Sequence, residues 1–286
     1  MTIFELVKIA LDALYEDGGE EYGSGLDAAI KKRMTYLKTS YGSLNSSTRI
    51  PVDYKDPATR FAYVYKYVAA HGDYIVQILE QLRSRLGENI FKQETLNVTC
   101  VGGGPGSDII GILKYFDEYQ EPIGKVSCQL LDKQQAWADT WSDLGLSLDS
   151  TLYVNSNFQR LDVTDPDSWQ YQKKFLRADL FTMSYFVSEV MSLDQSGVVT
   201  EFWQTLFEKA RPGALFLYDD NGHTDFTSYF DKLWEAAKLE CLLSADNKRF
   251  LPRFSEQSSE LGVYLTKFGQ NPKIQSQITY RVLKKT

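Results

Sequence analysis

Apolar residues recur at three- and four-residue spacing through about the first 95 residues, which is the spacing of amphipathic helices. We predict a first helix over residues 3–15, with Thr2 as its N-cap and Gly18-Gly19 at its end. A second helix is predicted from about Leu26 to Lys38. The stretch 40–53 is rich in Ser, Gly and Asn and has no period, so it predicts a loop of the kind that often covers ligands.

Two more helices are predicted before any strand begins. Asp56-Pro57 provides an N-cap followed by proline at the first helical position, and the helical spacing continues to about His71. Asp73 is predicted to cap a fourth helix, which closes at Gly87. The N-terminal region, residues 1–95, is therefore predicted to be four helices and a loop.

From Leu96 onwards, short apolar runs alternate with helical segments, a pattern that predicts an α/β fold. The helices have their apolar faces at the spacing needed to cover a sheet. Seven strands are predicted, near residues 96–101, 126–131, 152–161, 178–183, 214–218, 239–244 and 273–284.

The first of these strands leads directly into the glycine-rich segment 102–106, and an apolar helix follows. Gly102, Gly104 and Gly106 lack Cβ atoms, so this turn can adopt positive φ and let a ligand approach the main chain. The free N–H groups at the start of the next helix can face polar or anionic parts of that ligand. A strand, glycine turn and helix in this order is typical of nucleotide-binding α/β proteins.

Further polar residues follow the next strands. Asp132, after the second strand, can accept hydrogen bonds from both hydroxyls of a ribose, and Asp162, after the third, can meet an adenine amino group. Ser184 and Tyr185 follow the fourth strand, and His223 follows the fifth. Because ligands bind at the carboxyl edge of open α/β sheets, we expect these residues to surround one site.

Residues 96–286 resemble the class I S-adenosylmethionine-dependent methyltransferases, which share a Rossmann-like, mostly parallel seven-stranded sheet with an antiparallel last strand. The resemblance lies in Gly102-x-Gly104-x-Gly106, Asp132, Asp162-Val163 and the segment 211–214 before the fifth strand. It implies a methyltransferase domain over 96–286 that binds S-adenosylmethionine, with residues 1–95 as a helical cap or substrate region. It also implies that the glycine turn lies beside the methionine part of the cofactor.

In that family the residues after the fourth strand face the transferable methyl group, a position that falls here on Ser184, Tyr185 and Phe186. The family usually has an acid two positions before the first glycine, where this chain has Cys100, and Asp108 is the candidate substitute for holding the cofactor. We predict Tyr185, Glu189 and His223 as catalytic residues, with His71 as a less favoured general base. A neutral amine acceptor would need little acid or base help, because in-line positioning and desolvation suffice.

Charge is distributed unevenly along the chain, and it does not determine which acceptor is methylated. The net charge is −7, yet the segment 31–67 has eight basic and two acidic residues and six tyrosines. Interleaved basic and aromatic residues would suit RNA, whereas a helical cap over the sheet edge suits a small molecule, which we place first. A non-catalytic, methyltransferase-like interaction protein is the third alternative. The oligomeric state is not predicted.

Composition adds several expectations. Apolar residues make up 43% of the chain and charged residues 24%, as in ordinary globular proteins, and no apolar run is long enough for a membrane helix. The three cysteines, at positions 100, 128 and 241, lie in strand-like runs and are predicted to be buried thiols. No metal site is predicted. The first residues do not form a secretory signal, so we expect a cytoplasmic protein, with the nucleus as the alternative.

Overall fold

The structure is a computed structural model that describes residues 3–46, 48, 50–119, 121–146, 152–251, 261–273 and 275–286. Parts of four predictions lie outside the described residues: the N-cap at Thr2, the basic residue Arg49, residues 255–260 of a helix that we predict within 255–268, and Ile274 of the last predicted strand. Within the described residues, no helix is both long and apolar enough to span a bilayer.

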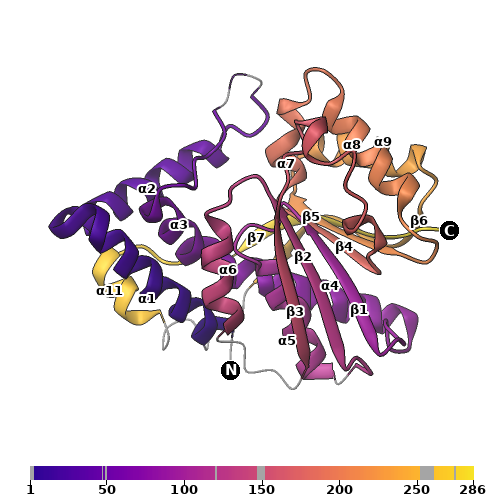
Figure 1. Cartoon of the computed structure of the whole chain (residues 1–286), viewed down its shortest axis with the longest axis horizontal. Coiled ribbons are helices and arrows are strands. Elements are labelled where there is room, and N and C mark those ends of the chain that lie inside the picture. Colours follow the sequence, from indigo (N-terminus) through magenta and orange to yellow (C-terminus); the bar gives the residue numbers. More distant parts are fainter. Residues whose placement is uncertain are drawn as a thin grey trace.

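The first two helices lie beside each other and meet α3 and the late helix α11 at one end of the sheet (Figure 1). Their bounds are α1 Ile3–Tyr22, α2 Leu26–Tyr41, α3 Pro57–Tyr63 and α11 Gly262–Phe268. The prediction that α1 ends at Gly18-Gly19 is wrong, because the helix continues through both glycines. A Cβ on Gly18 would come within 2.7 Å of Leu26 Cδ1, so this glycine allows α2 to approach α1 closely.

A continuous helical stretch joins the cap to the sheet. It consists of α3, a π-helical segment Val64–Val68 and α4 Ala69–Leu86. Asp56 caps α3 as predicted, accepting a hydrogen bond from the backbone N–H of Ala58, and Gly87 ends α4 with a φ of 71°. The predicted break before Asp73 is wrong: Asp73 is buried inside α4, and its carboxylate accepts a hydrogen bond from Gln77.

A seven-stranded sheet forms the centre of the molecule, in the order β3-β2-β1-β4-β5-β7-β6. The strands are β1 Thr95–Val101, β2 Lys125–Asp132, β3 Tyr153–Arg160, β4 Leu180–Ser184, β5 Leu215–Asn221, β6 Glu240–Phe250 and β7 Ser276–Lys284. The first five pair in parallel, and β7 is antiparallel to both β5 and β6. The predicted fold class is confirmed. The chain moves outward from β1 to β2 and β3 and then crosses back to β4 on the other side of β1.

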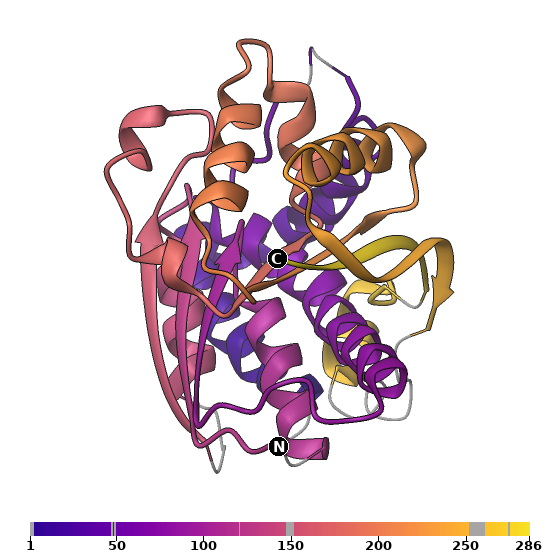
Figure 2. The same cartoon turned by 90° about the vertical axis from the view of Figure 1, so that its right-hand side faces the viewer.

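Helices cover both faces of this sheet, and Figure 2 shows α4 and α5 packed side by side. The other α-helices of the described ranges are α5 Ser107–Tyr119, α6 Trp137–Leu146, α7 Val187–Val190, α8 Val198–Lys209 and α9 Thr224–Ala236. One apolar cluster joins the N-terminal helices, α5 and α6 to the sheet, and a second lies between the sheet and α8 and α9. Neighbouring residues of one strand divide between the clusters, as Phe216 and Leu217 do, because strand side chains alternate faces.

The cysteines only partly follow the prediction. Cys100 and Cys128 are buried in β1 and β2, on the same side of the sheet. The prediction for Cys241 is wrong: its side chain is exposed on β6. This strand lies at the edge of the sheet, where one flank has no neighbouring strand, so an apolar run there does not ensure burial.

Candidate active site

A cavity that is partly open to solvent lies at the carboxyl ends of β1, β2 and β4. At this point β1 lies between β2, which follows it in the chain, and β4, to which the chain later crosses back. Ligands usually bind at such a position in open α/β sheets. The wall is built by the glycine turn, by residues that follow β2, β3 and β4, and by Val52, Tyr54 and Tyr63 of the cap.

The glycine turn is shaped by close packing as well as by positive φ. Gly102, Gly104 and Gly106 have φ angles of 67°, 47° and 88°. A Cβ on Gly102 would overlap the ring of Phe186, and one on Gly106 would lie 2.3 Å from Trp141. A Cβ on Gly104 would instead meet only atoms about 4 Å away, so this glycine leaves main chain accessible beside Asp132. Gly102 and Gly104 line the cavity, whereas Gly106 is packed beneath it.

Asp132 is held by the turn that it faces. Its Oδ2 accepts a hydrogen bond of 3.1 Å from the N–H of Gly104, and its Oδ1 accepts one of 2.8 Å from the N–H of Gln134. Burial raises the pKa of this carboxyl to about 6, although the two backbone hydrogen bonds oppose the shift. Asp132 lines the cavity, and its carboxylate has further lone pairs that can accept hydrogen bonds from a ligand hydroxyl.

Asp162 lies across the same cavity. Its Oδ1 accepts hydrogen bonds from the backbone N–H and the hydroxyl of Thr164, at 2.9 and 2.7 Å, which fixes the turn after β3. Ser184 also lines the cavity and donates a hydrogen bond of 2.9 Å from its hydroxyl to Asp219. The sheet edge thus brings Asp132, Asp162 and Ser184 together around one space.

Asp108 lies elsewhere. Its buried carboxyl accepts a 2.5 Å hydrogen bond from Thr182, and burial raises its pKa to about 7. Asp108 and Cys100 are both absent from the cavity wall, in the layer between α5 and the sheet. The carboxylate that the sequence suggested for the cofactor's amino group is therefore one layer below the cavity.

A second chamber adjoins the first, and Tyr63, Tyr185 and Glu189 line both. Three of its lining residues, Tyr63, Tyr67 and His71, come from the helical stretch of the cap. They are spaced four residues apart and share one face of that stretch. The rings touch one another, with centroid distances of 5.3 Å between Tyr63 and Tyr67 and 5.7 Å between Tyr67 and His71. Together with Tyr41 and Tyr185, these rings give the chamber an aromatic wall.

Among the nitrogen-containing side chains that line this chamber are His71 and Lys273. His71 is 4% exposed, and its Nε2 has no hydrogen-bond partner among the described residues. Burial and the charge of Lys273 lower the pKa of His71 well below its ordinary value, so the imidazole is neutral. Lys273 donates a 3.2 Å hydrogen bond to the hydroxyl of Tyr185, and burial lowers its pKa to about 8, so its ammonium form predominates at neutral pH.

Comparison with known proteins gives matches at the level of structure. No protein-family model and no curated protein matches the chain. It is similar to an O-methyltransferase family protein from Burkholderia thailandensis, with 12% identity and a TM-score of 0.49 over 91% of this chain and 72% of that one. It is also similar to S-adenosylmethionine-dependent methyltransferases from Clostridium acetobutylicum (12% identity, TM-score 0.41, 79% and 98% covered) and Methanosarcina mazei (14%, 0.38, 68% and 95%).

The arrangement of the sheet decides the fold. Its order 3-2-1-4-5-7-6, with β7 antiparallel to both neighbours, is the arrangement of the class I methyltransferases. This chain has the class I methyltransferase fold. Within this methyltransferase fold, the cavity occupies the end of the sheet at which the glycine turn lies.

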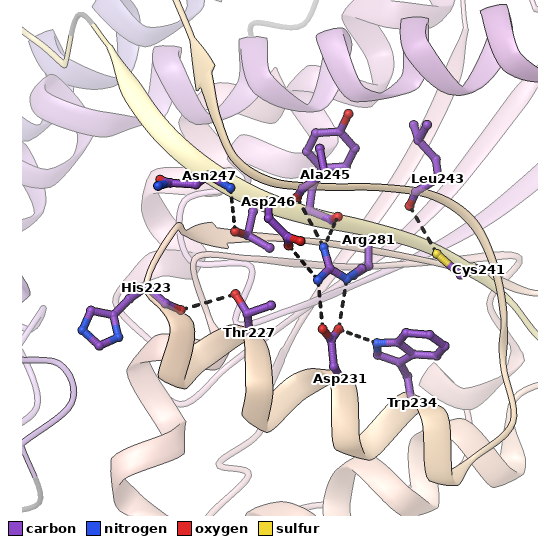
Figure 3. Close-up of polar contacts among 12 residues, drawn as sticks. His223, Thr227, Asp231, Trp234, Cys241, Leu243, Ala245, Asp246, Asn247 and Arg281 are labelled. Carbon is purple, nitrogen blue, oxygen red and sulfur yellow. Dashed lines mark hydrogen bonds and ion pairs between the residues drawn. The ribbon is translucent and has the colours of Figure 1, made fainter.

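His223 lies outside both cavities of the methyltransferase fold. Its half-exposed imidazole accepts a hydrogen bond from the backbone N–H of Asp225 and so caps α9, while its carbonyl oxygen accepts one from Thr227 (Figure 3). The position after β5 correctly placed it near the carboxyl edge, but the chain turns into α9 there and directs the side chain elsewhere.

Several residues of the two cavities were not predicted as site residues. Trp137 begins α6 and lines the first, while Asn221 and Lys273 line the second. The four-residue spacing from Tyr63 to His71 was a visible signal for the aromatic wall. Nothing in the sequence marks Lys273, which reaches the chamber because its backbone N–H donates to the carbonyl of Lys66, in the π-helical segment.

Proposed function

We propose that this protein is an S-adenosylmethionine-dependent methyltransferase whose acceptor is a small molecule. The observation that carries the proposal is the convergence of the glycine turn, Asp132 and Asp162 on one cavity, beside a chamber lined by tyrosines. The cofactor supplies an electrophilic methyl group on a positively charged sulfur. A cavity bordered by Asp132, Asp162 and Glu189 suits such a ligand, because carboxylates favour positive charge in a partly desolvated site.

The chain's residues would share the work of holding this ligand. Asp132 would accept hydrogen bonds from the ribose hydroxyls, and Asp162 would face the adenine. The open main chain at Gly104 would allow the closest approach of the turn, while Ser184 and Tyr185 would lie near the methyl group. Tyr185 and Glu189 belong to both cavities, so they would mark the boundary across which the methyl group passes.

The cap supports a small acceptor more than RNA. Tyr54, Tyr63 and Tyr65 of the basic, tyrosine-rich segment are turned into the protein, where burial raises the pKa of each phenol. Two of the segment's arginines also have partners: Arg60 donates to the carbonyls of Tyr54 and Lys55, and Arg33 forms an ion pair with Asp56. The cap thus encloses the second chamber, which helps to exclude water from the transfer.

Titration calorimetry with S-adenosylmethionine tests cofactor binding. We expect saturable binding to the wild type and affinity weaker by about 1 to 3 kcal/mol in Asp132→Ala, because the ribose hydroxyls lose their partner. Asp117→Asn, an exposed change on α5, is the matched control and should bind like the wild type. Absence of cofactor binding to the wild type would overturn the proposal and favour a non-catalytic interaction protein.

A second experiment identifies the acceptor pool. Protein and methyl-labelled cofactor are incubated with cell extract that has been fractionated into metabolites, RNA and protein. We expect the label in the metabolite fraction. Label in RNA, together with RNA binding that weakens steeply with salt, would contradict the small-molecule assignment and support RNA methylation through the exposed lysines of the cap.

A further inference from the structure

The second chamber combines an aromatic wall with the neutral imidazole of His71 and the ammonium group of Lys273. We infer that it binds a planar aromatic acceptor that has a phenolic hydroxyl, with the hydroxyl between His71 Nε2 and the ammonium of Lys273. This inference rests on the proposed function, because it names the acceptor that the methyl group would reach. It goes beyond that proposal in assigning a substrate class and two residues to it.

The imidazole of His71 provides the first argument. A polar atom that is buried without a partner costs stability, and a ligand that completes the hydrogen bond is one explanation for its presence in a cavity wall. Nε2 of His71 is in this position, in the wall of a chamber. The ring itself is fixed, because it stacks on Tyr185 with a centroid distance of 3.9 Å and an interplanar angle of 5°.

The charge of the chamber provides the second argument. The ammonium of Lys273 lies 4.3 Å from the ring centroid of Tyr185 and 5.6 Å from that of Tyr67, so it is held among aromatic rings at the wall. The nearby carboxyls of Asp219 and Asp220 attract it, and burial raises the pKa of both, to about 6 for Asp220. Glu189 and Lys38 are the other charged residues of the wall. An ammonium beside a ligand oxygen favours the ionised phenolate, which is a better nucleophile than the phenol.

The shape of the chamber provides the third argument. Tyr41 meets Tyr67 edge to face at 5.4 Å, and Tyr63 completes this wall, so flat surfaces border the space. Aromatic rings pack favourably against such surfaces in stacked or edge-to-face arrangements. An aliphatic amine would fill this space less well and would place its own positive charge near Lys273.

The transfer moves one proton and one methyl group. The phenolic O–H bond breaks and its proton passes to Nε2 of His71, while Lys273 stabilises the developing phenolate. The oxygen then forms a bond to the methyl carbon as the carbon–sulfur bond breaks, and the electron pair of that bond stays on sulfur. The products are an aryl methyl ether, a neutral thioether and a protonated His71, which returns its proton to solvent.

The test uses 4-nitrophenol as the probe, because its ionised and neutral forms absorb at different wavelengths. The full chain is saturated with S-adenosylhomocysteine, the demethylated cofactor, and the probe is titrated at several pH values. We expect saturable binding and a larger ionised fraction for the bound probe than for the free probe at the same pH. Nitrobenzene, which lacks the hydroxyl, should bind at least tenfold more weakly.

Two variants separate the roles of the residues. His71→Phe keeps a ring against Tyr185 and should weaken probe binding about tenfold, and His71→Gln should restore part of the affinity. Lys273→Met should abolish the excess ionisation of the bound probe, whereas Lys232→Met, an exposed control on α9, should leave it unchanged. Melting curves and S-adenosylhomocysteine affinity report whether each variant is folded.

The outcomes distinguish this inference from the proposed function. Binding of S-adenosylhomocysteine without binding of the probe, or probe binding that neither His71→Phe nor Lys273→Met changes, would overturn the phenolic acceptor and leave methyl transfer standing. Probe binding that depends on His71 and Lys273 in a chain that binds neither form of the cofactor would overturn methyl transfer while supporting the phenol site.

Discussion

The imidazole of His71 lies flat against the ring of Tyr185, and this stack joins the helical cap to the carboxyl edge of the sheet. Tyr185 forms this stack with a backbone φ of 53°, in a region that residues with side chains rarely adopt. Its N–H is held by the carbonyl of Asp219, and its hydroxyl accepts from Lys273. The surrounding contacts therefore hold the strained residue in place at the boundary between the two cavities.

The backbone of Tyr185 leads to a prediction about stability. Tyr185→Gly and Tyr185→Ala both remove the stack, but only glycine adopts positive φ without a Cβ clash. We expect the glycine variant to be more stable than the alanine variant by about 1 kcal/mol in urea unfolding. At Asp117, inside α5, the same pair should show the ordinary order, with alanine more stable. An alanine variant at 185 as stable as the glycine variant would contradict the positive φ.

The raised pKa of Asp132 predicts how cofactor binding depends on pH. Ribose hydroxyls donate to the ionised carboxylate, and with a pKa of about 6 this group is mostly protonated at pH 5 and mostly ionised at pH 7. Affinity for S-adenosylmethionine should therefore be about tenfold weaker at pH 5 than at pH 7. Asp132→Asn should bind more weakly and lose this dependence. Equal affinity of the wild type at both pH values would argue against Asp132 as the ribose partner.

The sequence predicted the sheet well because each strand signal was local. Apolar runs such as Leu96–Val101, bounded by glycine or acidic residues, identify strands without knowledge of their neighbours. The same holds for Asp132 and Asp162, because a residue directly after a parallel strand must lie at the carboxyl edge. These residues line one cavity, as the positions of their strands suggested.

The predictions that failed depended on contacts between distant segments. Gly18 resembles a helix end but lies inside α1, because Leu26 packs where a side chain would be. Asp73 resembles an N-cap but is buried in α4, and His223 resembles a catalytic histidine but caps α9. Lys273 is separated from His71 by about 200 residues, so only the folded chain brings them to the same chamber.

Asp108 predicts a pH dependence of stability. Its pKa is about 7 in the folded protein and near 3.8 in the unfolded chain, so the folded state holds a proton that the unfolded state has released between these values. The contribution of Asp108 to stability should therefore fall as the pH rises from 4 to 7, by on the order of 4 kcal/mol at about 1.4 kcal/mol per pKa unit. Asp219 and Asp220, whose pKa values are also raised, act in the same direction.

Asp108→Asn isolates the contribution of this one carboxyl. The amide resembles the protonated acid in shape and can still accept the hydrogen bond from Thr182. We expect urea unfolding free energies of the variant to change less between pH 4 and pH 7 than those of the wild type. Asp117→Asn, at an exposed position, should follow the wild type at every pH. Parallel curves for the wild type and Asp108→Asn would exclude a proton on Asp108 in this range.

Arg281 joins the antiparallel end of the sheet to α9, and this cluster predicts a large stability effect (Figure 3). Its guanidinium donates twice to Asp231, at 3.0 and 2.9 Å, forms an ion pair of 2.7 Å with Asp246, and donates to the carbonyl oxygens of Ala245 and Tyr280. The side chain of Arg281 is 7% exposed, whereas that of Asp231 is 25% exposed. Its removal leaves the partly buried carboxylate of Asp231 without its counter-ion, although the indole N–H of Trp234 still donates to it at 2.7 Å, and it takes a donor from two carbonyls.

We therefore expect Arg281→Leu to lower the free energy of unfolding by about 2 to 4 kcal/mol, below the full cost for a completely buried pair because Asp231 is partly solvated. The double variant Arg281→Leu, Asp231→Leu should recover part of this loss, since it removes the unpaired carboxylate as well. Arg177→Leu, at an exposed position, should change stability by less than about 0.5 kcal/mol. A double variant less stable than Arg281→Leu alone would show that the stranded charge of Asp231 is not the source of the loss.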